Sequence, residues 1–264
     1  MMVPQRPSGT ARLAAGLVVV ADPTALAQEA AERFAGIAAE ALARAGRFHV
    51  ALTGGSTPKR LYTLLATEPY RSRLPWPQTH VFWGDERCVP PDHPESNYGM
   101  VHEALLRHLS IPSEQVHRMR GEDPAPEQAA AEYERRLRTV FAPQAGTLPR
   151  FDLVLLGMGA DGHTASLFPN TGALREKQRW AVRNHVPKLQ ADRLTLTAPV
   201  INWGAAVLFL VAGDEKAAVL QEVLEGPADP ERLPAQLIRP TTGRLVWLVD
   251  RAAASRLAYA GKLK

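Results

Sequence analysis

The sequence contains a single cysteine, Cys88, among its 264 residues. One thiol excludes a disulfide within the chain and fits a reducing compartment, so we expect a cytoplasmic protein. No run of apolar residues approaches the roughly 18 that a bilayer span needs, and this predicts no association with a membrane. The N-terminal stretch MMVPQRPSGTARLAAG has no long apolar segment of the signal-peptide type. We expect residues 1–11 to form a short disordered leader.

Dense stretches of Lys and Arg are also missing. The net charge is only +4 and the basic residues are scattered, so nothing demands a nucleic acid partner. A few of these cations can instead serve an anionic small molecule. Neither an internal repeat nor a clear linker is found, and 45% hydrophobic residues supply a large core. We therefore expect residues 12–264 to form one α/β catalytic domain, and protein partners stay undefined.

Strand-like and helix-like patterns alternate along the chain. Asp22 and Pro23 open a helix as N-cap and first residue, and Gly46 ends it. The patterns predict strands at 17–20, 48–52, 80–83, 152–156, 193–200, 205–212 and 244–249, with helices at 24–45, 58–66, from about 97, from about 126, at 214–224 and briefly after 249. Such alternation predicts a mostly parallel sheet covered on both faces. Right-handed crossovers then place the strand-end motifs at one edge.

The segment DLVLLGMGADGHTASLFP, residues 152–169, is the most informative. An apolar strand ends in glycines and then presents Asp161 and His163, at the sheet edge where ligands bind in open α/β folds. Histidine, with a reference pKa of about 6.5, can take a proton at neutral pH. We interpret His163 as a general base; the alternative is a structural histidine.

Two other interpretations of this segment are less favourable. Gly157, Gly159 and Gly162 match GxGxxG, but Pro169 and Gly172 would end the following helix after about two turns. No second strand ending in an acid follows at the distance that NAD binding requires. A metal site needs further ligands, and neither HxxxH nor HExxH spacing occurs. The sequence thus predicts neither a dinucleotide nor a metal.

Three further groups of residues follow predicted strands. The turn TGGST, residues 53–57, suits a phosphate through free N–H groups and hydroxyls, although an ordinary capped turn explains it equally well. Asp85, Glu86 and Arg87 follow the next strand, and Arg87 can grip a phosphate or carboxylate in a bidentate manner; the alternative is a salt-bridged loop. Arg193 and Lys216 have the same pair of interpretations, anion contact or solvated cation.

Taken together, LTGGSTPKRLY from Leu52, WGDERCVPPDHPESNYGM from Trp83 and DLVLLGMGADGHTASLFP from Asp152 resemble the 6-phosphogluconolactonases. GDEKA from Gly213 and PAQLIRP from Pro234 are similar too, so the resemblance runs from about residue 17 to 258. The related glucosamine-6-phosphate deaminases typically carry DEY in place of the DER at residues 85–87. They carry FNEP, with a glutamate of their own machinery, in place of SLFP at 166–169. Both differences favour the lactonase.

The resemblance implies a Rossmann-like, three-layer αβα fold and hydrolysis of 6-phospho-D-glucono-1,5-lactone in the oxidative pentose phosphate pathway, without a metal or organic cofactor. It implies that His163 activates water. It also implies a sugar-phosphate site bordered by Gly54, Gly55, Ser56 and Thr57, with Arg87, Arg193 and Lys216 as basic contacts.

A mechanism follows as a hypothesis. Phosphate binding fixes the lactone beside His163, Asp161 orients the imidazole, and the oxyanion is stabilised by Arg87 or by backbone N–H groups near Gly159. Two alternatives remain: deamination of glucosamine 6-phosphate, and a sugar-phosphate sensor without turnover. Ammonia release would indicate the first, and binding without turnover the second.

Overall fold

The computed structural model describes residues 16–258, so the predicted leader at 1–11 lies outside the described residues. A seven-stranded parallel sheet has the order β1-β10-β9-β6-β2-β3-β5. Its strands are β1 (Gly16–Val20), β2 (Phe48–Leu52), β3 (Thr79–Trp83), β5 (Val116–His117), β6 (Leu153–Leu156), β9 (Ala206–Val211) and β10 (Arg244–Asp250). The expected α/β fold with a mostly parallel sheet is confirmed.

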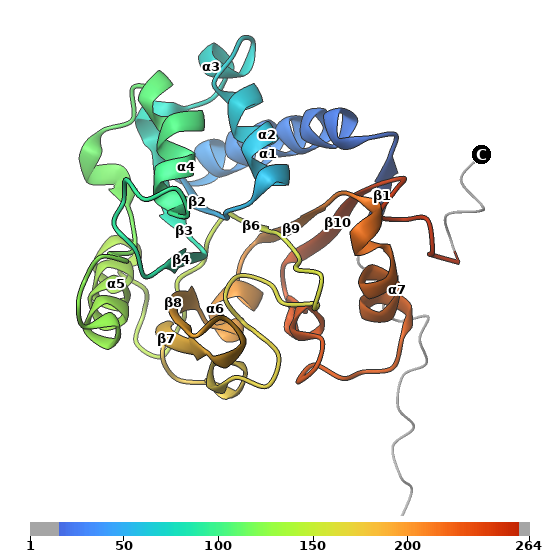
Figure 1. Ribbon diagram of the computed structural model, residues 1–264. Coiled ribbons are helices and arrows are strands. Elements are labelled where there is room, and N and C mark those ends of the chain that lie inside the picture. The colour runs from blue at the N-terminus through green and yellow to red at the C-terminus, as the bar shows by residue number, and fades with distance from the viewer. Residues whose placement is uncertain (1–15, 259–264) are drawn as a thin grey trace, which may run out of the picture.

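Helices cover both faces of this sheet, as Figure 1 shows, with α1, α2 and α4 on one side and α5, α6 and α7 on the other. The helices are α1 (Pro23–Ala45), α2 (Ser56–Leu65), α3 (Tyr70–Arg73), α4 (Asn97–Ala104), α5 (Pro126–Phe141), α6 (Ala198–Asn202) and α7 (Ala217–Glu225). Asp22 caps α1 as expected, because its carboxylate accepts from the N–H groups of Thr24 and Ala25. Gly46, with φ of 67°, ends that helix. None of the helices within residues 16–258 is long and apolar enough to cross a membrane.

The order of the strands defines where a ligand can bind. The chain adds β2, β3 and β5 in one direction across the sheet, and then adds β6, β9 and β10 in the other. The direction reverses between β2 and β6, which pair with each other. Ligands of open α/β folds bind outside the carboxyl ends of the strands at such a reversal. The loops that follow β2 and β6 therefore lie where the strand order reverses, which is the expected position of a ligand site.

A second, antiparallel sheet has the order β4-β8-β7 and contains β4 (Asp85–Arg87), β8 (Ala191–Leu196) and β7 (Ala181–Val186). Two expectations are corrected here. The segment Asp85–Arg87 is a strand, not only a strand-end loop, and the strand predicted at 193–200 ends at Leu196. The reason is Pro199, which fits the first turn of a helix but not a strand interior, so that α6 begins there.

Two predicted helices are absent from the described residues. Residues 157–171 form turns instead of two helical turns, because Gly162, Ala165 and Asn170 have φ between 46° and 77°. After β10, residues 251–256 form turns, although the Asp250 carboxylate accepts from the N–H of Ala253 as a helix cap would. The other predicted strands and helices are observed, with small changes of boundary. The single-domain assignment stays a prediction.

A cluster of three histidines lies on β2, β3 and β5, with His49 and His117 buried and His80 partly exposed. His80 Nδ1 and His117 Nε2 are 3.1 Å apart, and Arg136 Nε donates to His117 Nδ1 at 3.0 Å. A guanidinium only donates, so His117 carries its proton on Nε2 and donates to His80. Burial lowers the pKa of His49 and of His117 to about 3, aided by nearby positive charges such as Arg47 for His49 and Arg136 for His117.

We expect this cluster to make the fold acid-sensitive. The folded-state pKa values of His49 and His117 lie below the unfolded value near 6.5, so the unfolded chain binds more protons between these limits. Stability is therefore full above pH 6.5 and falls as the pH drops towards 3, by about 1.4 kcal/mol per pH unit for each ring. Urea unfolding at pH 7.5, 6.5 and 5.5 measures this slope. The double variant His49→Gln/His117→Gln should have a flatter slope, and an unchanged slope would contradict the assignment.

Candidate active site

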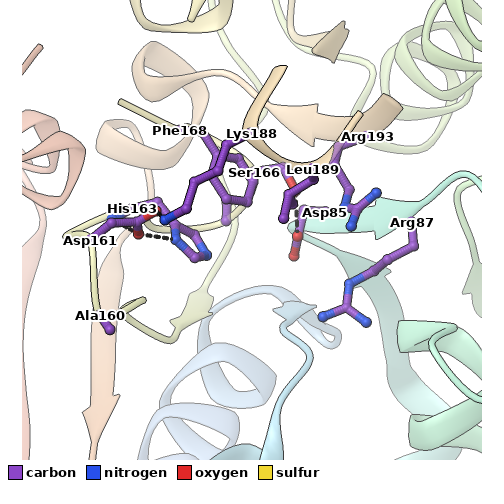
Figure 2. Close-up of a pocket in the computed structure, with 11 residues that line it drawn as sticks. Asp85, Arg87, Ala160, Asp161, His163, Ser166, Phe168, Lys188, Leu189 and Arg193 are labelled. Atoms are coloured by element: carbon purple, nitrogen blue, oxygen red, sulfur yellow. Dashed lines mark hydrogen bonds and ion pairs between the residues drawn. The ribbon is translucent and has the colours of Figure 1, made fainter. Parts of the chain in front are cut away.

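A pocket of about 320 Å³ lies at the carboxyl ends of the parallel strands, next to the small sheet. It is lined by Asp85, Arg87, Ala160, Asp161, His163, Ala165, Ser166, Phe168, Lys188, Leu189 and Arg193. Figure 2 shows the imidazole of His163 on one side, the guanidinium groups of Arg87 and Arg193 on the other, and the carboxylate of Asp85 between them. The structure thus brings together five of the residues singled out in the sequence: Asp85, Arg87, Asp161, His163 and Arg193.

The loop after β6 presents His163 through its glycines. Gly159 N donates to His163 O at 2.9 Å, and the Thr164 hydroxyl donates to Gly157 O at 2.8 Å. A side chain at Gly159 would collide with the imidazole, because its Cβ would lie 2.1 Å from both Nδ1 and Cε1 of His163. Glycine is required at this position so that the backbone can pass the ring. The loop therefore folds tightly around His163 and leaves the ring facing the pocket.

Asp161 and His163 form a pair despite the spacing of only two residues. His163 Nδ1 lies 2.5 Å from Asp161 Oδ1, and Lys188 Nζ lies 3.4 Å from Asp161 Oδ2. The hydrogen bond with His163 is the largest cause that holds the pKa of Asp161 well below its ordinary value. The ionised carboxylate can only accept, so the neutral imidazole carries its proton on Nδ1. Its Nε2, which has no hydrogen-bond partner within residues 16–258, is left with the lone pair.

Arg87 and Arg193 are neighbours across the small sheet, where their Cα atoms are in register between β4 and β8. Arg87 donates to the carbonyl of Glu95, and Arg193 Nη1 donates to the carbonyl of Asp192 at 3.0 Å. Lys188, at the exposed tip of the β7–β8 hairpin, adds a third cation to the pocket wall. Three cations at one small pocket suit an anionic ligand, because charge-assisted bonds to phosphate or carboxylate are strong.

The turn Gly54–Thr57 and Lys216 do not line this pocket. Gly54 packs against Asn97, because a Cβ there would lie 1.8 Å from Asn97 Oδ1. Asn97 Nδ2 donates to the carbonyl of Asp85 at 2.9 Å, so the turn is tied to the pocket wall through one side chain. Lys216 is half-buried and ends a short 3-10 turn after β9. The contact of these residues with a sugar phosphate stays a prediction.

Buried polar groups that sequence reasoning left without a role hold the wall in place. The Ser166 hydroxyl donates to Asp85 Oδ2 at 2.7 Å. The carboxylate of Glu86 accepts from the N–H groups of Asn97 at 2.7 Å and of Tyr98 at 2.8 Å, and so caps the start of α4. Burial raises the pKa of Glu86, and these backbone bonds oppose that rise. Glu86 therefore fixes β4, with Asp85 and Arg87 on either side of it, against α4.

Sequence reasoning missed Lys188 and the whole of β7, and it noted Phe168 only as part of the SLFP segment, without a place in the pocket. Buried and exposed residues alternate along β7, as in a strand with one buried face. One of the buried positions is the polar Asn184, so the sequence lacks the alternation of apolar and polar residues that predicts a strand. Asn184 Nδ2 donates to Ser166 O and to the Thr171 hydroxyl, both at 2.9 Å. Without β7 the hairpin tip that carries Lys188 could not be placed. The only signal for it was the Pro-Lys-Leu-Gln turn at 187–190.

A second pocket of about 620 Å³ adjoins the first and shares Ala160, Asp161, Phe168 and Lys188 with it. It is larger and more apolar, and it also contains the carboxylates of Glu215 and Glu222. His163 and the two arginines line only the smaller pocket, so we place the chemistry there. Within residues 16–258, no three side chains of His, Cys, Asp or Glu are grouped in a way that could hold a metal ion.

An open parallel sheet whose pocket combines a histidine–aspartate pair with several cations is typical of an enzyme that acts on small anionic substrates. Residues 21–247 match the family of glucosamine-6-phosphate isomerases and 6-phosphogluconolactonase, and the chain belongs to this family. A 6-phosphogluconolactonase of Synechocystis sp. is 47% identical over 83% of this chain and 88% of its own length. The human 6-phosphogluconolactonase is 43% identical over 88% of each chain. The solved 6-phosphogluconolactonase of Trypanosoma cruzi is 30% identical, with a TM-score of 0.81 over 92% of this chain and 97% of that one.

Proposed function

We propose that this protein hydrolyses 6-phospho-D-glucono-1,5-lactone to 6-phospho-D-gluconate, the second step of the oxidative pentose phosphate pathway. The 6-phosphogluconolactonases that match most of the chain make it a carboxylic ester hydrolase. The observation that carries the mechanism is the imidazole of His163, which faces a pocket whose opposite wall holds Arg87 and Arg193. That distribution suits a substrate with an electrophilic carbonyl at one end and a phosphate at the other.

The phosphate is bound first. Arg87 and Arg193 offer planar sets of donors, and Lys188 adds a point charge, so all three attract a dianion. Gly54, Gly55, Ser56, Thr57 and Lys216 are the further phosphate contacts that we propose from the sequence. This binding energy, remote from the reacting bond, holds the lactone carbonyl beside His163.

The reaction then proceeds through a tetrahedral intermediate. Nε2 of His163 takes a proton from water, and the water oxygen forms a bond to C1. Backbone N–H groups near Gly159, on the same side of the pocket as His163, stabilise the oxyanion; Arg87 is the alternative donor if the phosphate is held by Arg193 and Lys188. When the bond between C1 and the ring oxygen breaks, the imidazolium returns its proton to that oxygen. Asp161 holds the proton on Nδ1 throughout, so that Nε2 is the group that acts.

The sister activity, deamination of glucosamine 6-phosphate, is the alternative. Phe168 stands where the FNEP segment of those enzymes has its glutamate, and here its ring stacks on the imidazole of His163. A phenyl ring can neither give nor take a proton, so the pocket lacks at this position the acid that the deaminase resemblance would require. This observation supports the lactonase.

A direct assay decides between the two activities. Freshly prepared 6-phosphogluconolactone is supplied with an enzyme that oxidises the product, and the spontaneous hydrolysis rate is subtracted. We expect turnover of this substrate and no ammonia from glucosamine 6-phosphate. The unphosphorylated gluconolactone should be poorer by about 10²-fold or more in kcat/KM, since it loses at least two charge-assisted contacts. Ammonia release, or binding of the lactone without turnover, would overturn the proposal.

A further inference from the structure

The imidazole of His163 is enclosed on more than one side. The ring of Phe168 stacks on it with a centroid distance of 4.1 Å and an angle of 21° between the planes. Gly159 lies against the Nδ1–Cε1 edge, and Asp161 holds Nδ1. These contacts leave the Nε2 edge turned towards the pocket, as Figure 2 shows. The imidazole is thus held by three kinds of contact: an aromatic stack, a close backbone contact and a hydrogen bond to a carboxylate.

Phe168 is itself held in place, so it can serve as a rigid wall. Its side chain is buried, and its carbonyl accepts from the hydroxyl of Thr171 at 2.7 Å. Asn184 reaches in from β7 and donates both to that hydroxyl and to the carbonyl of Ser166. The backbone on either side of Phe168 is therefore anchored to the small sheet. Phe168 also lines both pockets.

The stacked geometry has a consequence for charge. The face of a phenyl ring carries negative partial charge and attracts a cation, while it attracts a neutral imidazole less strongly. During the proposed reaction His163 becomes an imidazolium, so the contact with Phe168 strengthens as the transition state is approached. An interaction that is stronger in the transition state than in the ground state raises kcat.

We propose that Phe168 is a positioning residue of the active site, whose ring orients the imidazole of His163 and stabilises the positive charge that it gains during turnover. The inference rests on the proposed function, and it assigns to an apolar side chain a role in the base chemistry. The other charged groups that line the pocket are Asp85, Arg87, Asp161, Lys188 and Arg193. Substitution of Phe168 leaves all of them in place.

Phe168→Leu, compared with Phe168→Tyr, tests the proposal. Leucine keeps an apolar wall but removes the π face, and tyrosine keeps the face. We expect Phe168→Leu to lower kcat by about 2- to 30-fold with little change in KM. The midpoint of the acidic limb of kcat/KM should move to lower pH by about 0.4 to 0.7 units, because the protonated ring loses its partner. Phe168→Tyr should restore most of kcat and the original midpoint.

Phe209→Leu is the matched control. Phe209 stacks on Trp247 at 3.8 Å and 3° in the core of the large sheet, and it does not line either pocket. This variant loses an equivalent stacked pair and should keep the wild-type acidic midpoint. An unchanged profile in Phe168→Leu, no rescue by Phe168→Tyr, or an equal displacement in Phe209→Leu would each overturn the proposal. Failure of the proposed function itself is distinguishable, because the wild-type protein would then show no lactone turnover.

Discussion

His163→Ala is expected to lose about 10²- to 10⁴-fold in kcat, the range typical for removal of a general base. The variant should still bind 6-phosphogluconate nearly as the wild type does, because Arg87 and Arg193 on the other wall of the pocket are unchanged. Calorimetric titration measures binding, and the coupled assay, corrected for spontaneous hydrolysis, measures turnover. A loss of kcat with retained affinity is the signature of a group that acts on the reacting bond.

The sequence offers a matched control for this experiment. His185 also pairs with an aspartate, with Nδ1 lying 2.9 Å from Asp192 Oδ1, but it is exposed on β7 and does not line the pocket. His185→Ala should keep wild-type turnover. If purified His163→Ala retained turnover well above the spontaneous rate, the assignment of the base would be refuted.

Asp161→Asn should have the second-largest effect, a loss of about 10²- to 10⁴-fold in kcat with little change in overall structure. An amide in this position can donate to Nδ1, which moves the imidazole proton to Nε2 and removes the lone pair that must accept the proton from water. The substitution also removes the negative charge that stabilises the imidazolium. The coupled assay measures kcat, and thermal unfolding verifies the fold.

Asp192→Asn is the control, because it alters the Asp192–His185 pair outside the pocket, together with the ion pair between Asp192 and Arg183. We expect it to leave kcat unchanged. Wild-type turnover in Asp161→Asn would show that the 2.5 Å contact with His163 has no part in the chemistry. If Asp161→Asn and Asp192→Asn lowered kcat to the same extent, the loss would instead come from a general effect on the loops of this region.

Much of the fold follows from local patterns. The apolar run Leu153–Leu156 is buried as expected. Gly46 ends α1 in the left-handed conformation that glycine adopts without strain. These features depend on neighbouring residues in the chain, since periodic burial and turn chemistry are local properties. The resemblance added the family, which residues 21–247 confirm. Its implications for the individual site residues stay predictions.

Other features were hidden because buried polar side chains break the patterns. Asn184 sits at an inward position of β7, and its amide donates to two groups of the loop that follows β6, the carbonyl of Ser166 and the hydroxyl of Thr171. In residues 157–171 the composition allows at most a short helix before Pro169, and three residues with positive φ keep the whole segment irregular. In both places long-range hydrogen bonds or the packing around His163 outweigh local propensity.

By itself, the sequence determined that strands alternate with helices, that glycines follow the strands, and that an acid and a histidine stand together after one of them. Parallel pairing then sends those strand ends to one edge. Only the tertiary structure decided which side chains share a pocket: it pairs Arg87 with Arg193 across a small sheet, brings Lys188 over Asp161, and lays Phe168 on His163. It also leaves Gly54–Thr57 and Lys216 outside that pocket. The physical reason is that such contacts join segments distant in sequence, whose encounter depends on the packing of the whole core.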